Sequence, residues 1–232
     1  MLIKNKILYT STIIISIIVA IYIINEKINN KIIYFPIKII SIESKLINSN
    51  KEEIFYITKN YLKTKSFFTM DIDDLKNKIE TIDWVRIVNI KRSYPNEVKI
   101  FITEHRPIAI WNNEYYLNEF GKVFSAKKIG KNFPLIVSKS NRNDILYEYF
   151  SFFVKEISNN KLNIKIKKIE ENDIRSLSIS LLSGITIIVG SRDIKKKINI
   201  FFKAYKTLNS SDLKKIRYID MRYSNGFSIG WK

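Results

Sequence analysis

Residues 85–103 read VRIVNIKRSYPNEVKIFIT. Two runs of alternating apolar and polar residues, Val85–Lys91 and Glu97–Thr103, flank the turn-forming residues Ser93-Tyr94-Pro95-Asn96. Alternation with a period of two is typical of a strand with one buried face, and Pro and Asn between two such runs indicate a turn. The stretch therefore predicts a β-hairpin that turns one face of its second strand toward a core.

The segments before this hairpin predict one strand and two helices. Pro36–Glu43 alternates like a strand, and Ser49 with Glu52 forms a capping-box pattern for a helix that runs to Leu62. Asp71–Asp74 supplies the acidic first turn expected of a second helix. Together with the hairpin, the order β-α-α-β-β predicts a small α+β module.

A second domain of short strands is expected after Trp111. We expect strands at Tyr115–Leu117, Val123–Phe124, Ser176–Leu181, Ile185–Val189, Ile216–Met221 and Phe227–Trp231, and helices at 144–157 and 193–208. Asn225-Gly226 between the last two strands is a strong hairpin signal. If the final strand, which ends next to Lys232, lies at a sheet edge, its free N–H and C=O groups can pair with a partner strand. The alternative is that another strand of the same chain covers it.

The N-terminus carries an apolar run from Ile7 to Ile24 without a charged side chain. Its length is close to the roughly 20 residues that span a bilayer. Ala20 stands alone among large residues, which disfavours a cleaved signal peptide, and Lys4 and Lys6 favour a cytoplasmic N-terminus. We expect a cytoplasmic tail at 1–6, a single transmembrane helix at 7–24 and a linker at 25–34 before an exported body.

The composition excludes several classes of site. The chain has no cysteine and one histidine, so disulfides, zinc–thiolate centres and thiol nucleophiles are excluded. The formal net charge is +18, and residues 113–232 carry 23 basic against 11 acidic side chains, a net +12. Lys outnumbers Arg by 32 to 8, and Ile, Lys, Asn, Phe and Tyr abound, as adenine/thymine-rich codons dictate. We interpret most of the excess as a result of this base composition. Since no nucleic-acid-binding motif accompanies it, we expect the charge to matter beside anionic membranes or acidic proteins outside the cytoplasm, not on nucleic acid.

No motif indicates catalysis. Glycine never occurs in a phosphate-binding pattern, and Asp71, Asp73 and Asp74 lack the spacing of a calcium loop, so we interpret them as a helix cap. His105 has no nucleophile or paired acid near it in sequence and is interpreted as structural. We interpret the pair Glu170–Glu171 as a solvated face. The sequence therefore predicts no catalytic, cofactor-binding or metal site, and not an enzyme.

Five phrases in chain order resemble the bacterial cell-division family FtsQ/DivIB. They are Phe67–Asp71, Ile82–Asn96, Thr103–Trp111, Leu117–Phe124 and Asp220–Trp231. The third is close to the signature E-H-x-P-x-A-x-W, the fourth matches L-x-x-x-G-x-V-F, and the last is similar to D-L-R-Y-x-x-G-x-A-V-x-W. Tyr94 replaces the commoner Trp, and the cytoplasmic tail is shorter than is usual. The lack of a tail beyond Lys232 favours the Gram-negative FtsQ type.

The resemblance implies a POTRA module at 35–105 and a mostly antiparallel β domain with flanking helices at 106–232. It implies a non-enzymatic bitopic scaffold of the inner membrane at the division site, with a periplasmic body. In this family the C-terminal edge recruits FtsB and FtsL by adding a strand of FtsB. Carried over, the partner-binding residues are Arg222, Tyr223, Ser224, Asn225, Gly226, Phe227, Ile229 and Trp231. Arg222 would offer its planar fork to a partner carboxylate. The alternative is a POTRA-bearing transport or secretion component.

Overall fold

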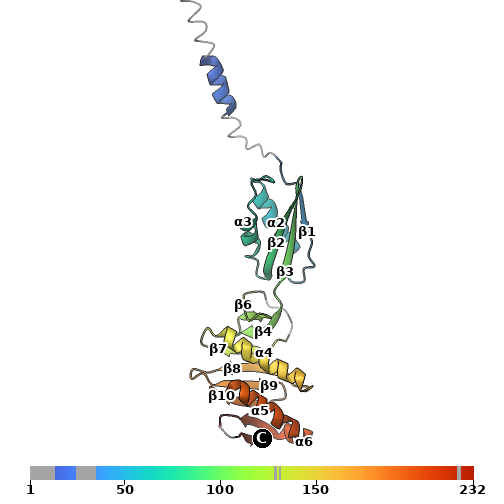
Figure 1. The fold of residues 1–232 in the computed structure, drawn as a ribbon, viewed down its shortest axis with the longest axis vertical. Coiled ribbons are helices and arrows are strands. Elements are labelled where there is room, and N and C mark those ends of the chain that lie inside the picture. Colours follow the sequence, from blue (N-terminus) through green and yellow to red (C-terminus); the bar gives the residue numbers. More distant parts are fainter. Residues whose placement is uncertain (1–13, 25–34, 128–129, 131, 224–225) are drawn as a thin grey trace, which may run out of the picture. The chain divides into compact units, whose positions relative to one another are not determined.

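The computed structural model describes residues 14–24, 35–127, 130, 132–223 and 226–232 (Figure 1). The chain divides into two compact units, Met1–Glu104 (unit 1) and His105–Lys232 (unit 2). Residues 14–24 are helical, and within the described residues no helix is long and apolar enough to cross a membrane. The expected span at 7–24 is thus described only in part, and the expected tail at 1–6 and linker at 25–34 lie outside the described residues.

Unit 1 has the β-α-α-β-β order that the sequence predicts. Its elements are β1 (Ile39–Ile42), α2 (Lys51–Leu62), α3 (Ile72–Ile79), β2 (Val85–Ser93) and β3 (Glu97–Glu104). β3 lies in the middle of the three-stranded sheet, parallel to β1 and antiparallel to β2. Both helices cover one face of the sheet (Figure 1) and close a core in which Ile54, Leu75, Ile79, Val98 and Ile100 are fully buried.

The helix caps of unit 1 confirm one prediction and correct another. Asp71 accepts hydrogen bonds from the N–H groups of Asp73 and Asp74, so its role as a helix cap is confirmed. The cap of α2 is Asn50, whose Oδ1 accepts from the Glu52 N–H at 2.8 Å. The prediction of Ser49 was wrong by one residue, and the Ser49 N–H is engaged elsewhere.

The Ser49 N–H donates to Glu104, the last residue of β3. Its carboxylate accepts the N–H groups of Ile47, Asn48 and Ser49 at 3.0, 3.0 and 2.6 Å. Burial alone would raise the pKa of Glu104, but the hydrogen bonds from Ser49, Ile47 and Asn48 outweigh it and hold the pKa below its ordinary value. Glu104 thus ties the segment between β1 and α2 to the end of the central strand.

Unit 2 is built on one large mixed sheet. Its elements are β4 (Pro107–Trp111), β5 (Tyr115–Asn118), β6 (Val123–Phe124), β7 (Leu135–Ser138), α4 (Asn143–Asn159), β8 (Ile166–Glu171), β9 (Leu177–Leu181), β10 (Thr186–Gly190), α5 (Ile194–Thr207), α6 (Ser210–Lys215), β11 (Ile216–Asp220) and β12 (Ser228–Trp231). In the described part of the chain the strand order is β12-β11-β10-β9-β8-β7-β4-β5-β6, and five of the eight pairs are antiparallel. The sheet is therefore mostly antiparallel, as expected. The sequence pattern did not indicate the three parallel pairs.

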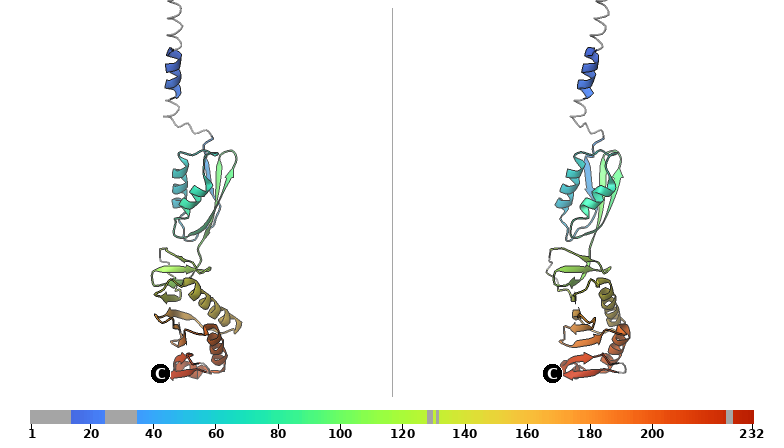
Figure 2. Two further views of the ribbon diagram at one scale, coloured as in Figure 1. Left: turned by 60° about the vertical axis from the view of Figure 1, so that its left-hand side comes forward. Right: turned by 90° about the vertical axis from the view of Figure 1, so that its left-hand side faces the viewer.

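Two long helices cover one face of this sheet. α4 and α5 lie side by side on it (Figure 2), and their apolar side chains meet the buried residues of the strands. Phe153 of α4 packs against Phe201 and Phe202 of α5, with ring centroids 5.8 and 4.9 Å away. The helical spacing that predicts these helices is thus the spacing of the side chains that fill the core.

The two-residue strand β6 forms one edge of the sheet, and its phenylalanine side chain packs inward. Phe124 is buried and stacks on the His105 ring with centroids 4.1 Å apart and planes 9° apart. Nδ1 of His105 lies 2.9 Å from Nδ2 of Asn118, the last residue of β5. These contacts support the interpretation of His105 as a structural residue.

The interpretation of Glu171 as solvated is wrong. Its side chain is buried at the end of β8, accepts the Ser138 hydroxyl at 3.0 Å and lies 3.4 Å from an Arg142 nitrogen. A buried carboxylate needs such partners, because an unpaired charge away from water is costly. The arrangement is one carboxylate neutralised by one guanidinium, which is a structural pairing and not an acid/base dyad.

Candidate partner-binding site

The last strand, β12, forms the other edge of the nine-stranded sheet. It runs antiparallel to β11, with Ile219 opposite Ile229 and Asp220 opposite Ser228. Within the described residues no strand pairs with its outer side. The antiparallel pairing predicted around Asn225-Gly226 is confirmed.

The outward backbone groups of β12 follow from the hydrogen bonds of its neighbour. The Met221 N–H donates to the Ile188 oxygen of β10 at 2.8 Å, so the backbone groups of Ile219 point to β10 and those of Tyr218 and Asp220 point to β12, on the β12 side of the register shift between Ile216 and Tyr218. The Lys232 N–H donates to the Lys215 oxygen at 2.8 Å, which keeps the even-numbered residues of the last strand turned inward. Because backbone groups alternate along a strand, the N–H and C=O groups of Ile229 and Trp231 point out of the sheet. These are the groups that an added strand pairs with.

Gly230 lets β12 lie close beneath an aromatic ring. A Cβ at this position would overlap the ring of Tyr218, which comes from the neighbouring strand β11. Glycine therefore permits this close approach. Ile229 next to it packs its side chain against the core of unit 2 and fixes the strand from the inner face.

Large apolar side chains gather around this edge and face solvent. Trp231 is 53% exposed, Tyr223 59% and Phe227 38%. Tyr and Trp present wide rigid surfaces at low entropic cost, and they are enriched where interfaces carry most of their binding energy. The aromatic residues of the predicted site are therefore accessible to a partner.

The Arg222 guanidinium is paired within the chain. Its Nε lies 3.0 Å from both carboxylate oxygens of Asp220, and its Nη2 lies 2.6 Å from Oδ2. The Arg222 side chain holds the pKa of the Asp220 carboxyl below its ordinary value through these hydrogen bonds. In the chain without a partner, Nε and Nη2 of the guanidinium are thus bound to Asp220 as the chain leaves β11, and the binding of a partner carboxylate by Arg222 stays a prediction.

The edge is positively charged. Residues 214–232 contain Lys214, Lys215, Arg217, Arg222 and Lys232 against the single carboxylate of Asp220. Lys232 Nζ is held by the Lys214 oxygen at 2.8 Å. Because Arg222 neutralises Asp220, the charge that remains at this edge is positive. It favours a partner strand that is flanked by acidic residues.

The structure thus places Arg222, Tyr223, Gly226, Phe227, Ile229 and Trp231 along one edge, from the end of β11 to β12. Ser224 and Asn225 of the predicted site lie outside the described residues. Sequence reasoning missed Tyr218, Asp220 and the lysines that hold the chain end. Alternation within Ile216–Asp220 signals a strand, but only the register with β12 shows which side chains border the edge.

The described residues hold no cluster of the side chains that usually bind metals. Among them, no group of three or more His, Cys, Asp or Glu side chains could hold a metal ion.

Comparisons with known proteins agree with both units. Residues 35–105 match the model of the FtsQ-type POTRA domain, and residues 109–222 match that of the C-terminal domain of cell division protein FtsQ/DivIB. The chain belongs to the FtsQ/DivIB family. The family's own division thus falls close to the boundary between unit 1 and unit 2.

Three relatives illustrate the similarity, and each is called cell division protein FtsQ. The protein of Actinobacillus pleuropneumoniae serotype 3 is 29% identical over 72% of this chain and 73% of its own. That of Neisseria gonorrhoeae is 24% identical over 84% and 80%, and that of Methylomonas methanica is 28% identical over 85% and 79%. The FtsQ/DivIB chain described above is therefore similar to these proteins across both units.

Proposed function

We propose that this FtsQ/DivIB chain is a non-enzymatic, bitopic membrane scaffold that links early and late proteins of the bacterial division machinery. It binds an FtsB-like and an FtsL-like partner at the β12 edge, by accepting a partner strand. The observation that carries the proposal is an outer edge with free backbone groups at Ile229 and Trp231, bordered by exposed aromatic rings. That combination is what strand addition requires.

The membrane arrangement is part of this proposal. Residues 7–24 form the anchor, 1–6 the cytoplasmic tail and 25–34 the linker, with units 35–105 and 106–232 in the periplasm. The uncharged apolar run from Ile7 to Ile24 supports it. The matched POTRA type is that of FtsQ, which favours division over the alternative of a transport or secretion component.

The partner-binding residues of the proposal are Arg222, Tyr223, Ser224, Asn225, Gly226, Phe227, Ile229 and Trp231. They differ in what they contribute. Tyr223 and Trp231 supply contact area, Ile229 supplies outward backbone groups, and Arg222 holds the chain next to the edge through Asp220.

A titration of the full-length chain in detergent with a peptide from the FtsB-like protein of the same bacterium tests the proposal. Truncating a hot-spot aromatic costs about 2 kcal/mol, so Trp231→Ala or Tyr223→Ala weakens binding about 30-fold. Tyr56→Ala, which removes an exposed aromatic of α2, is the matched control and leaves the affinity unchanged. Equal affinities for all these variants and the unmodified chain would show that the peptide binds elsewhere.

A further inference from the structure

One end of unit 1 carries a cluster of aromatic rings that faces solvent. Phe68 forms edge-to-face contacts with Phe35 and Phe67, with centroids 5.4 and 5.3 Å away, and Phe67 contacts Tyr94 at 5.9 Å. Phe35 is 52% exposed, Phe68 61% and Tyr94 72%, whereas Phe67 is buried beneath them. A contiguous exposed patch of this kind marks an interaction site more often than chance exposure does.

Three chain segments hold this cluster in place. The Phe67 N–H donates to the Phe35 oxygen at 2.9 Å, and Pro36 forms an isolated β-bridge with Ser66. Ser66 and Thr69 close the turn between them by three mutual hydrogen bonds. The Lys38 N–H donates to the Asn96 oxygen at 2.8 Å and joins the hairpin tip to the other two segments. The rings are therefore presented by a fixed backbone.

The same three segments are basic. Residues 35–38, 63–69 and 92–96 contain Lys38, Lys63, Lys65 and Arg92 and no acidic residue. The first acidic residues after the second and third of these segments are engaged locally: Asp71 caps α3, and Glu97 accepts the Ser41 hydroxyl at 2.7 Å. We call Phe35, Phe68, Tyr94 and the four basic side chains the aromatic–basic face.

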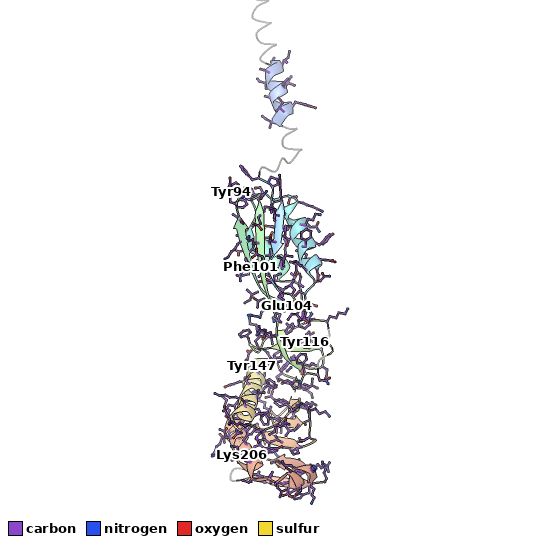
Figure 3. All side chains as sticks on the ribbon, turned by 90° about the vertical axis from the view of Figure 1, so that its right-hand side faces the viewer. Tyr94, Phe101, Glu104, Tyr116, Tyr147 and Lys206 are labelled. Carbon is purple, nitrogen blue, oxygen red and sulfur yellow. The ribbon has the colours of Figure 1, made fainter. Side chains whose placement is uncertain are left out.

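The aromatic–basic face lies at the end of unit 1 from which the chain leads back to the N-terminal apolar run. Figure 3 shows Tyr94 and Glu104 at opposite ends of unit 1, and Glu104 leads on to unit 2. Ten residues, 25–34, separate the end of the apolar run at Ile24 from Phe35. Ten residues reach at most about 35 Å even when fully extended. If the run spans the membrane, the aromatic–basic face is tethered within that distance of the lipid surface.

We propose that the aromatic–basic face rests on the headgroup layer of the membrane that holds the N-terminal anchor. This inference rests on the proposed membrane anchoring. Aromatic rings are favoured at the membrane–water interface, and Lys and Arg near it are attracted to anionic lipids. The aromatic–basic face supplies both from one fixed surface, and its lack of acidic residues removes the repulsion that anionic headgroups would otherwise meet. The contact orients unit 1 on the membrane.

The absence of cysteine from the chain gives a direct test, because one introduced thiol can be labelled selectively. Full-length protein is reconstituted into nanodiscs of phosphatidylcholine and phosphatidylglycerol, with a nitroxide quencher on the lipid headgroups. A fluorophore is attached at Thr64→Cys, between the basic residues of the face, or at Ile47→Cys. Ile47 is 77% exposed, and its N–H bonds to Glu104, so it reports on the opposite end of unit 1.

The expected result is quenching at residue 64 at least about twofold stronger than at residue 47, as interfacial anchoring predicts. The double substitution Phe68→Ser with Tyr94→Ser lowers quenching at residue 64 to the level of residue 47. Tyr56→Ser, an exposed aromatic outside the face, leaves it unchanged. Nanodiscs of phosphatidylcholine alone weaken the quenching, because the electrostatic attraction is lost.

Two failures are distinguishable. If the protein does not co-elute with nanodiscs, the proposed membrane anchoring fails, and this inference fails with it. If the protein co-elutes but residues 64 and 47 are quenched equally, the anchoring stands and the membrane contact of the aromatic–basic face is overturned. That second result is also the one expected of a face that binds another protein.

Discussion

The two edges of the nine-stranded sheet differ in how far their backbone groups are available for pairing with another strand. At one edge, β6 is two residues long, and its Phe124 is buried against His105 and Tyr116. At the other, β12 has four residues, outward backbone groups at Ile229 and Trp231, and an exposed Trp231 ring. A very short strand is a common protection against unwanted pairing, and a longer open edge invites it. β12 is therefore the open edge of the sheet, and β6, with two residues and a buried side chain, is the closed edge.

The largest expected effect concerns the closed edge. Phe124→Ala removes a buried ring that stacks on His105, and such truncations cost about 3 kcal/mol of unfolding free energy. Binding of the FtsB-like peptide remains unchanged, because β12 lies at the far edge of the sheet. Urea denaturation and peptide titration of the same sample check both halves. A loss of affinity without a loss of stability would reverse the roles assigned to the two edges.

A slightly smaller effect is expected at the open edge. Ile229→Pro removes an N–H that points out of the sheet and places a ring where the partner strand pairs, so the affinity falls about 100-fold, or about 2.7 kcal/mol. Ile229→Ala is the matched control, because it removes the same packing but keeps the N–H. Both variants lose comparable stability, and only the proline loses binding. If the alanine variant binds as weakly as the proline variant, side-chain packing and not backbone pairing holds the partner.

The smallest effect concerns acid. Because Arg222 lowers the pKa of folded Asp220, the pair stabilises the chain above the unfolded carboxyl pKa of about 3.9. This stabilisation is lost as the pH falls below that value through the lowered folded pKa. Asp220→Asn therefore has a shallower decline in urea midpoint between about pH 5 and about pH 3 than the unmodified chain. Parallel declines in both proteins would show that the pair contributes no pH-dependent stability.

Local sequence patterns predicted most of the helices and strands. The hairpin, the two helices of unit 1 and the helices α4 and α5 follow from alternation and helical spacing, since each buries the side chains that create the pattern. β4, β7, β8 and α6 were missed. β7 is only four residues long, and β8 reads IKKIEE, so its charged residues mask the alternation. The parallel pairs of β7 with β4 and β8 join distant segments, which no local pattern reveals.

The candidate site was predicted more by resemblance and chain position than by chemistry. Exposed Tyr223 and Trp231 lie where the pattern indicated an edge strand. The bond between Arg222 and Asp220 was not predicted, although the two residues are only two positions apart in the sequence. A buried Glu171 was read as solvated, since its neighbours Ser138 and Arg142 are far from it in sequence. The pairing of Glu171 depends on tertiary geometry, whereas the pair of Asp220 and Arg222 is local.

The parallel pairing of β1 with β3 has a mechanical consequence. The chain enters unit 1 at the start of β1 and leaves it at the far end of β3, and these strands lie side by side in register from Ile39–Glu97 to Ile42–Ile100. Tension along the chain therefore slides one strand past the other and loads their hydrogen bonds together, instead of peeling them apart one by one. At the end of β3, the Glu104 carboxylate adds further resistance, because it accepts hydrogen bonds from three backbone N–H groups. A force that pulls the two ends of unit 1 apart is therefore resisted by shear between β1 and β3.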